Sequence, residues 1–425
     1  SSSEPSNTKG LIPEIESYAK FALHANNKSM STTMAAVRML GGLLKDKTLG
    51  PKVVPIVADE ARTFGMDNLF RQIGIYAPLG QLYEPEDAGS MMFYKEAKNG
   101  QLLEEGINEA GAISSWAAAA TSYSVHNVPT LPFYIYYSMF GFQRVGDLIW
   151  AAADQRARGF LLGATAGRTT LSGEGLQHQD GSSHLIASTI PNCRAYDPAY
   201  AYELAIIMQH GMVQMMERDV DEFYYITVMN ENYEQPSIPG EIEDNVLRGL
   251  YKLQSRGDDN DNIRVRLIGS GTILNEVIAA ADILLDQFNI NSDIFSATSF
   301  TELAKEARTV ERENRLNPLE TQKRSHLQEC LPGEMPIIAA TDYVSALPHL
   351  VAPYLEARFI ALGTDGFGRS DQRTVLREFF EVDRKNIALA AIESLVRLKL
   401  IDRAVLVGAL KTFEIDQESA PPWTL

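Results

Sequence analysis

Residues 133–165 read FYIYYSMFGFQRVGDLIWAAADQRARGFLLGAT, and this stretch decides the fold. Two short runs rich in aromatic and apolar residues, Phe133–Tyr137 and Phe160–Thr165, are typical of buried β-strands. Between them, Val145–Arg156 carries apolar residues at helical spacing. A strand, a helix and a second strand in this order indicate two neighbouring strands of a parallel sheet.

The same alternation extends to both sides of this unit. Further strands are expected at Val53–Val57, Leu185–Ile190 and Phe223–Val228, and further helices at Met34–Leu44, Asn108–Ala120 and Ala199–Met216. Ser31 and Thr32 precede the first of these helices as candidate N-caps. The pattern predicts an α/β fold with a doubly wound, mostly parallel sheet that carries helices on both faces.

A polar, acidic stretch interrupts the alternation at Ser255–Asn262 (SRGDDNDN) and is typical of a linker. Arg264 and Arg266 then alternate with apolar residues, which predicts a strand with one exposed face. Later strands are expected at Asp293–Ser296, Pro336–Ala340 and Phe359–Leu362, and helices at Leu274–Leu285, Ile387–Leu398 and Ala404–Phe413. We therefore expect a tail and lead-in over residues 1–29, a first domain over 30–254, a linker over 255–260 and a smaller α/β domain over 261–425.

Composition excludes several classes of protein. The chain has 425 residues, of which 45% are hydrophobic and 22% charged, so it should be globular with two or three domains. The net charge of −17 argues against nucleic acid or an anionic membrane as a partner. Two cysteines, Cys193 and Cys330, cannot form a disulfide framework, which favours a reducing, cytoplasmic location. No apolar run reaches the roughly 18 residues of a membrane-spanning helix.

Candidate functional residues gather where parallel strands are expected to end. Asp59–Arg62 follow one strand, Gly106–Glu109 open the alanine-rich helix, and Gly173–Gly181 form a glycine-rich loop. A fourth group is aromatic and basic and consists of Tyr137, Phe140 and Arg144. Ligands of open α/β sheets bind at the carboxyl ends of the strands, so these groups are the first candidates for a site.

Each group also has a purely structural interpretation. Glu109 in the first turn of a helix could simply favour the helix dipole, and Asp59 with Arg62 could form a surface ion pair. Glu174, His178, Asp180 and His184 match no standard zinc spacing, so no metal site is predicted. The sequence contains no nucleophile elbow, Walker loop, Cys-x-x-Cys or Gly-x-Gly-x-x-Gly motif. Pattern alone favours a two-domain α/β enzyme without naming its reaction.

Five longer segments are more specific. They are Ala58–Met66 (ADEARTFGM), Phe133–Arg144 (FYIYYSMFGFQR), Gly173–Gly181 (GEGLQHQDG), Ile190–Glu203 (IPNCRAYDPAYAYE) and Leu362–Asp371 (LGTDGFGRSD). Together they resemble the homodimeric, bacterial type of the first component of the pyruvate dehydrogenase complex. That family depends on thiamine diphosphate and is related to transketolase. The resemblance runs from about Ser31 to near the C-terminus.

The resemblance implies a family fold of three α/β domains. This chain resembles the middle domain, which binds the pyrimidine ring of the cofactor, and the smaller C-terminal domain. The family's diphosphate motif, Gly-Asp-Gly, does not occur in this sequence. The Mg²⁺ ligands are therefore expected in an N-terminal domain outside it, and the chain alone should be inactive.

The resemblance also implies roles for individual residues. Glu109 matches the glutamate that hydrogen-bonds N1′ of the pyrimidine, and a carboxyl in an apolar pocket can share that proton. Ile107 and Phe140 match positions that pack against the ring, and Asp59 lies beside it. The substrate-side residues of the family are matched by His178, Tyr137 and Glu174. Relatives often carry a second histidine where Ser182 and Ser183 stand, and His184 is the residue that could replace it.

The implied reaction is oxidative decarboxylation of pyruvate, with transfer of the acetyl group to lipoamide. The implied partners are a second copy of the chain, and the dihydrolipoyl acetyltransferase core with its lipoyl domain. Two alternatives stay open. One is a transketolase-like sugar-transferring enzyme, and the other is a non-catalytic pyrimidine-domain subunit that completes the site of another chain.

Overall fold

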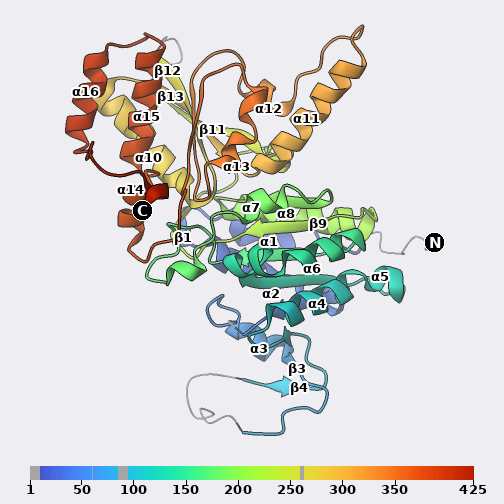
Figure 1. Ribbon diagram of the computed structural model, residues 1–425. Helices are drawn as coiled ribbons and strands as arrows, with labels where there is room; N and C mark the ends of the chain where they lie inside the picture. Colours follow the sequence, from blue (N-terminus) through green and yellow to red (C-terminus); the bar gives the residue numbers. More distant parts are fainter. Residues whose placement is uncertain (1–9, 60, 85–93, 259–262) are drawn as a thin grey trace. The chain divides into compact units, whose positions relative to one another are not determined.

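The computed structural model describes residues 10–59, 61–84, 94–258 and 263–425 (Figure 1). Glu60, the first nine residues of the expected lead-in and the end of the expected linker, residues 259–260, lie outside the described residues. The chain forms two compact units. The first comprises Ser1–Ala166, Ile186–Ala195 and Tyr200–Gly240, and the second Gly167–Leu185, Tyr196–Ala199 and Glu241–Leu425.

The first unit is built on a six-stranded sheet in the order β5-β2-β6-β7-β9-β8. Its strands are β5 (Leu103–Glu104), β2 (Val53–Val57), β6 (Leu131–Tyr137), β7 (Phe160–Ala164), β9 (Phe223–Thr227) and β8 (Cys193–Tyr196). All neighbours from β5 to β9 pair in parallel. The predicted parallel α/β sheet is confirmed, and four of its strands, β2, β6, β7 and β9, begin and end within two residues of the expected positions.

Helices cover both faces of this sheet. The helices named for this part of the chain are α1 (Ile15–Leu23), α2 (Thr32–Leu43), α3 (Asp67–Ile73), α4 (Glu109–Ala120), α5 (Ser122–Val125), α6 (Phe142–Asp154) and α8 (Ala201–Met212). Tyr134 and Tyr136 of β6 share a buried cluster with α4 and α6. Phe133, on the opposite face, stacks on Phe160 with ring centroids 4.6 Å apart. There Gly211 of α8 comes so close that an added Cβ would lie 2.9 Å from the Phe160 ring.

The described part of the expected tail and lead-in, residues 10–29, belongs to the folded first unit. The Tyr18 hydroxyl of α1 donates to Gln209 Oε1 of α8 at 2.8 Å. Strand β1 (Lys28–Met30) pairs antiparallel with β10 (Tyr233–Gln235). Ser31 caps α2 by accepting the Met34 N–H at 3.1 Å, as predicted.

The second unit contains a five-stranded mixed sheet in the order β11-β13-β12-β14-β15. Its strands are β11 (Leu250–Arg256), β13 (Asn291–Ala297), β12 (Arg264–Gly269), β14 (Ile337–Ala340) and β15 (Phe359–Leu362). Strand β11 runs antiparallel to β13, and the other pairs are parallel. The expected boundary at residues 254–255 therefore lies inside a strand, and the chain passes for the last time from the first unit to the second at Gly240–Glu241. The polar end of β11 resembles a linker in sequence, because β11 is an edge strand and an edge strand tolerates polar side chains.

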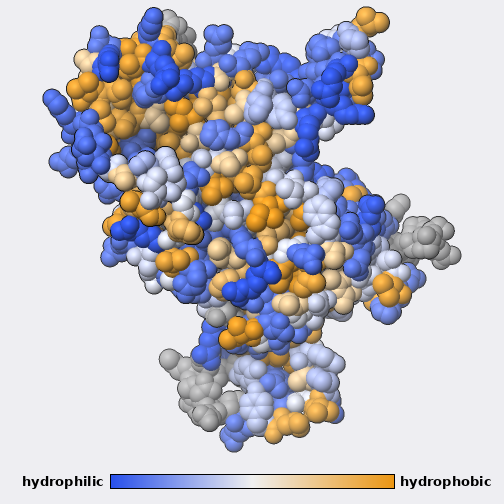
Figure 2. Space-filling model, viewed as in Figure 1, coloured by the Kyte–Doolittle hydropathy of each residue, from blue (hydrophilic) through white to orange (hydrophobic). Residues whose placement is uncertain are grey.

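Eight helices accompany this sheet in the described part of the second unit. They are α9 (Glu243–Arg248), α10 (Leu274–Phe288), α11 (Phe300–Leu316), α12 (His326–Cys330), α13 (Ala346–His349), α14 (Arg373–Phe379), α15 (Arg384–Arg397) and α16 (Arg403–Thr412). Figure 2 shows mainly hydrophilic side chains over the outer surface of α11. None of the described helices combines the length and apolar character that a bilayer-spanning segment requires.

Two predictions of strand character were wrong. Arg264 and Arg266 in β12 are buried, at 7% exposure each, rather than on an open face. Arg264 pairs with Asp293 of the neighbouring strand at 2.8 Å, and Arg266 donates to the Pro332 carbonyl at 2.7 Å. The expected strand Leu185–Ile190 begins instead within α7 (Ser183–Ala187).

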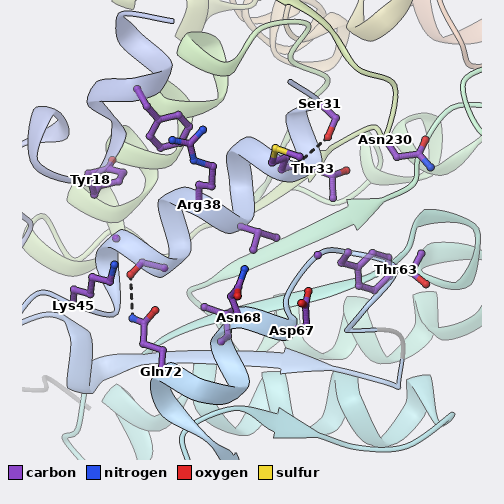
Figure 3. Close-up of a pocket in the computed structure, with 18 residues that line it drawn as sticks. Tyr18, Ser31, Thr33, Arg38, Lys45, Thr63, Asp67, Asn68, Gln72 and Asn230 are labelled. Carbon is purple, nitrogen blue, oxygen red and sulfur yellow. Dashed lines mark hydrogen bonds between the residues drawn. The ribbon is translucent and has the colours of Figure 1, made fainter. Parts of the chain in front are cut away.

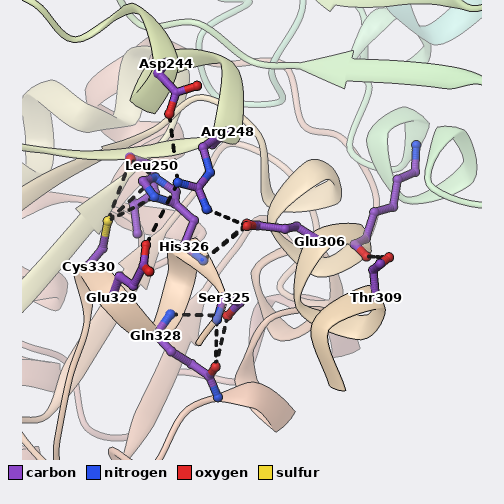
Figure 4. A network of polar contacts seen from close by, with 11 residues as sticks. Asp244, Arg248, Leu250, Glu306, Thr309, Ser325, His326, Gln328, Glu329 and Cys330 are labelled. Atoms are coloured by element: carbon purple, nitrogen blue, oxygen red, sulfur yellow. Dashed lines mark hydrogen bonds and ion pairs between the residues drawn. The ribbon is translucent and has the colours of Figure 1, made fainter. Parts of the chain in front are cut away.

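A polar network joins α9, β11, α11 and α12 inside the second unit (Figure 4). Arg248 contacts Glu306 at 2.5 Å, and His326 Nε2 donates to the Leu250 carbonyl at 2.7 Å. Burial raises the pKa of the Cys330 thiol to about 11, so it stays protonated at neutral pH. A protonated, half-buried thiol is a poor nucleophile, and we interpret the network as structural.

Candidate functional site

The carboxyl ends of three adjacent strands, β5, β2 and β6, form the candidate site of the first unit. Glu109 follows β5, Asp59 follows β2, and Phe140 follows β6. Tyr137 is the last residue of β6. Parallel pairing brings these ends to one edge of the sheet, as the sequence analysis expected.

Glu109 is held at the start of α4 by its neighbours in the chain. Gly106 has a φ of +75°, which glycine adopts readily. Asn108 caps the helix by accepting the Gly111 N–H at 3.0 Å. The Glu109 side chain is only 12% exposed, so its position is set by packing as well as by the helix.

Four side chains connect Glu109 to the end of β6. Glu109 Oε1 lies 3.1 Å from Arg144 Nη1, and the Arg144 guanidinium lies 3.9 Å from the centre of the Phe140 ring. Phe140 meets Tyr137 edge to face at 5.7 Å, and Tyr137 meets Phe64 at 5.4 Å. We call these five residues the Glu109 cluster. It places a mostly buried carboxyl beside aromatic rings at the sheet edge.

Asp59 and Ile107 lie nearby but outside this cluster. Asp59 is exposed, and in the part of the chain that the structure describes neither a hydrogen bond nor an ion pair joins it to Glu109. Burial, and next the charge of Asp59, raise the pKa of Glu104 to about 7. Ile107 is 78% exposed, so its side chain is accessible to a ligand.

The sequence analysis missed three residues at this edge. Phe64 stood inside the segment ADEARTFGM but received no role. Glu105 directly follows β5 and accepts a hydrogen bond from the Ser115 hydroxyl at 2.5 Å. The Tyr134 hydroxyl is buried, and burial followed by the charges of Glu109 and Glu105 raises its pKa. Nothing in the sequence pointed to the contact between Glu105 and Ser115 or to the Tyr134 hydroxyl.

The glycine-rich loop belongs to the second unit, although it follows β7 of the first sheet. Within it, Glu174 Oε2 lies 3.6 Å from His178 Nδ1. Both side chains are partly exposed, at 39% and 23%, so they remain accessible to a ligand. Gln179 braces the loop by donating to the Leu171 carbonyl at 3.1 Å and accepting the Arg369 N–H at 2.6 Å.

Asp342 anchors the start of this loop. The carboxylate is fully buried and accepts the N–H groups of Thr169 and Thr170 at 2.8 and 3.0 Å. It also accepts their hydroxyls at 2.7 and 2.5 Å. Two oxygens therefore satisfy four donors, which fixes the backbone eight residues before His178.

His184, named above as the residue that could replace the second histidine of relatives, is enclosed by the protein. It is 2% exposed and packs edge-on against the Tyr343 ring at 4.8 Å. Burial lowers the pKa of His184 to about 4, although Asp180 acts in the opposite direction. A neutral, buried imidazole cannot supply a proton to a ligand at neutral pH.

The predicted site residues thus form two groups. Glu109, Tyr137, Phe140, Asp59 and Ile107 lie in the first unit, and Glu174 and His178 lie in the second. Within the described parts of the chain, no group of three or more histidine, cysteine or acidic residues is arranged to hold a metal ion. The chemistry available is that of a shielded carboxyl with aromatic rings, and of an imidazole beside a carboxylate.

Comparison with known proteins identifies the family. Residues 12–236 match the family described as "Pyruvate dehydrogenase E1 component middle domain". The chain belongs to the pyruvate dehydrogenase E1 family. Residues 249–383 match the "Transketolase-like TK C-terminal domain", which fits the second sheet. Both matches agree with the domains that the sequence resembled.

Curated relatives of the E1 family extend this match over nearly the whole chain. The chain is 55% identical over 413 residues to the pyruvate dehydrogenase E1 component of Pseudomonas aeruginosa. It is 50% identical over 424 residues to that of Escherichia coli (strain K12). These alignments cover 97% and 99% of the chain but 47% of each relative, so the chain spans about half the length of the relatives it matches.

Solved structures support the fold. Transketolase from Campylobacter jejuni superposes with a TM-score of 0.64 at 16% identity, over 91% of this chain and 50% of that one. A structure titled "Split gene transketolase, inactive beta4 tetramer" superposes with a TM-score of 0.56 at 15% identity, over 87% of this chain and 99% of that one. The E1 chain therefore shares the transketolase-like fold of two successive α/β domains.

Proposed function

We propose that this chain supplies the pyrimidine-binding and C-terminal parts of a thiamine-diphosphate-dependent pyruvate dehydrogenase. One observation carries the proposal. A shielded carboxyl, Glu109, stands beside aromatic rings at the carboxyl edge of the sheet, in a chain 50–55% identical to E1 components along nearly its whole length. The complete reaction requires the half of the protein that this chain does not span.

The donor set fits the pyrimidine end of the cofactor. An aminopyrimidine needs a flat apolar surface and a carboxyl for its ring nitrogen. Phe140 offers a partly exposed ring, Ile107 an exposed apolar side chain, and Glu109 the carboxyl. The diphosphate end needs Mg²⁺. Because the diphosphate motif of the family, Gly-Asp-Gly, does not occur in this sequence, we propose that the metal ligands belong to the rest of the protein.

Thiamine diphosphate, when bound, supplies a nucleophilic carbon and an electron sink for decarboxylation of a 2-oxo acid. The task of Glu109 is to hold a proton against the pyrimidine nitrogen. Its low exposure favours this role, because a shielded carboxyl interacts more strongly than one in water. Arg144 pairs with Glu109 in this structure and would have to share the carboxyl with the cofactor.

His178, Glu174 and Tyr137 are proposed to act on the substrate side. The imidazole of His178 can donate a proton to a developing oxyanion, and Glu174 beside it favours the required orientation. The Tyr137 ring is held from two sides by Phe64 and Phe140. A rigidly held side chain can orient a small substrate at little entropic cost.

The proposed partners follow from membership of the E1 family. They are a second copy of the protein, and the acetyltransferase component whose lipoyl group accepts the acetyl unit. We propose that the chain alone binds thiamine diphosphate weakly, because most of the charge of the cofactor lies on the diphosphate. An acidic chain of net charge −17 offers that anion no general attraction.

Substrate assays on the longer native protein test the proposal. With Mg²⁺ and thiamine diphosphate, it should decarboxylate pyruvate and acetylate a lipoyl acceptor, and it should not transfer ketol units from xylulose 5-phosphate. Sugar transfer without pyruvate turnover would favour the transketolase-like alternative. If the protein shows neither activity, but a partner protein becomes active when the chain is added, the result would favour the non-catalytic subunit.

A further inference from the structure

A cavity of about 700 Å³ lies within the first unit, between α2 and the segment that leads into α3 (Figure 3). Its volume is in the range of small-molecule sites. Thr63 follows β2 and Asn230 follows β9, so the cavity opens at the carboxyl edge of the sheet. Phe64 lines it and also contacts Tyr137, which gives the cavity a wall in common with the Glu109 cluster.

The α2 side of the cavity carries two cations, Arg38 and Lys45. The Arg38 guanidinium lies 3.9 Å from the centre of the Phe21 ring, and its Nη1 lies 3.6 Å from the Met30 sulfur. In the described part of the chain no carboxylate pairs with Arg38 or Lys45. Acidic residues outnumber basic ones by 55 to 38 in this chain. An arginine that is held in place without an acidic partner is therefore available to pair with an anionic ligand.

Gly41 of α2 lines the cavity and lies between these cations in the sequence. A Cβ added there would meet Gln72 Oε1 and Leu69 Cδ2 at 3.7 Å, which is ordinary contact distance, so the position is not needed for close helix packing. The facing wall carries Asp67, Asn68 and Gln72, and Gln72 donates to the Gly41 carbonyl at 3.1 Å. Figure 3 shows this wall opposite the α2 side chains. It presents acceptors that suit hydroxyl groups, whereas an anion is favoured only on the Arg38 side.

We propose that this cavity is a second ligand site, next to the Glu109 cluster, that binds an organic anion with an apolar body. The anionic group, a carboxylate or phosphate, would pair with Arg38 and Lys45. The apolar body would lie along Val37, Met34 and Phe64. The proposal does not depend on the reaction assigned above, because it concerns binding in a cavity that this chain forms by itself.

Calorimetric titration with phenyl phosphate tests the site on this chain and on the longer native protein. The neutral analogue phenol should bind at least about tenfold more weakly. Arg38→Gln should weaken phenyl phosphate binding by about tenfold or more, which corresponds to about 1.4 kcal/mol. Gly41→Leu should abolish it by filling the cavity, whereas Gly41→Ala should retain it. Thermal unfolding of each variant verifies that it is folded.

A second cavity provides the matched control. It lies in the second unit, has about 710 Å³, and its Lys323 is already paired with Glu313 at 2.9 Å. Lys323→Gln should leave phenyl phosphate affinity unchanged. Equal affinity in Arg38→Gln and the unaltered chain would overturn the proposal, as would equal affinity for phenol. Binding by this chain but not by the longer protein would also overturn it, because the cavity would then be covered by the other half.

Discussion

Replacing Asp342 by alanine should release the start of the loop that carries Glu174 and His178. The carboxylate accepts two backbone N–H groups and two hydroxyls from Thr169 and Thr170 at 2.5–3.0 Å. The hydroxyls can turn to other acceptors, but the two buried amides cannot. Each unsatisfied buried donor costs about 1–3 kcal/mol, so the two amides cost about 2–6 kcal/mol together. This is a large share of the roughly 5–15 kcal/mol that stabilises a typical domain.

Hydrogen exchange of the amides in residues 167–185 measures this loss locally, without assuming that two units unfold together. Exchange at Thr169 and Thr170 should accelerate strongly in Asp342→Ala. Asp342→Asn keeps one acceptor oxygen, so its exchange rate at Thr169 and Thr170 should lie between those of the unaltered chain and of Asp342→Ala. Asp365→Ala is the control, since Asp365 accepts one N–H, that of Ser345 at 3.1 Å. Unchanged exchange in Asp342→Ala would refute the reasoning, because the loop would then be held by other contacts.

Three further predictions concern pH, packing and the reaction. Burial and Asp59 raise the pKa of Glu104 from 4.5 to about 7. Between these values the folded state binds more protons than the unfolded state, so stability should fall as the pH rises through this window. Urea unfolding from pH 4.5 to 7.5 should show a flatter profile for Glu104→Gln, and an unchanged slope would contradict the assignment. Gly42→Ala should destabilise the chain by about 1–3 kcal/mol in urea, because an added Cβ would lie 3.0 Å from Tyr18 Cβ, whereas Gly41→Ala should not. In the longer native protein, His178→Ala should lower pyruvate turnover about 10²–10⁴-fold while thiamine diphosphate affinity persists. Loss of cofactor affinity instead would contradict the assignment of His178 to the substrate side and would place it at the cofactor side. Replacement of the exposed His126 by alanine is the control.

Much of the first sheet could be predicted because its strands are buried on both faces. Such strands appear in sequence as short apolar runs, and the runs Val53–Val57 and Phe223–Val228 were recognised in this way as the strands β2 and β9. Glu109 and the aromatic group after β6 were found by the same logic, since polar residues after a buried strand mark the sheet edge. The contact between them was not predictable, because Arg144 joins Glu109 on α4 to Phe140, which lies 31 positions later in the turn after β6.

The failures have specific physical causes. Arg264 and Arg266 suggested an exposed face, but the acceptors that allow their burial, Asp293 and the Pro332 carbonyl, lie 29 and 66 residues further along the chain. The Leu185–Ile190 run was assigned as a strand although Asp180 accepts the Ser182 and Ser183 N–H groups at 3.0 and 3.1 Å and starts a helix there. Short apolar runs do not distinguish a strand from a buried helical turn.

The central claim, that Glu109 holds the pyrimidine proton of the cofactor, is tested most directly by hydrogen–deuterium exchange at C2 of bound thiamine diphosphate. The measurement uses the longer native protein with Mg²⁺, and compares Glu109→Gln with the control Glu105→Gln. The account predicts that exchange slows about 10²–10⁴-fold in Glu109→Gln and stays close to the unaltered rate in Glu105→Gln. Unchanged exchange in Glu109→Gln, with cofactor still bound, would contradict it. Glu109 would then have only the structural role of favouring the helix dipole in the first turn of α4.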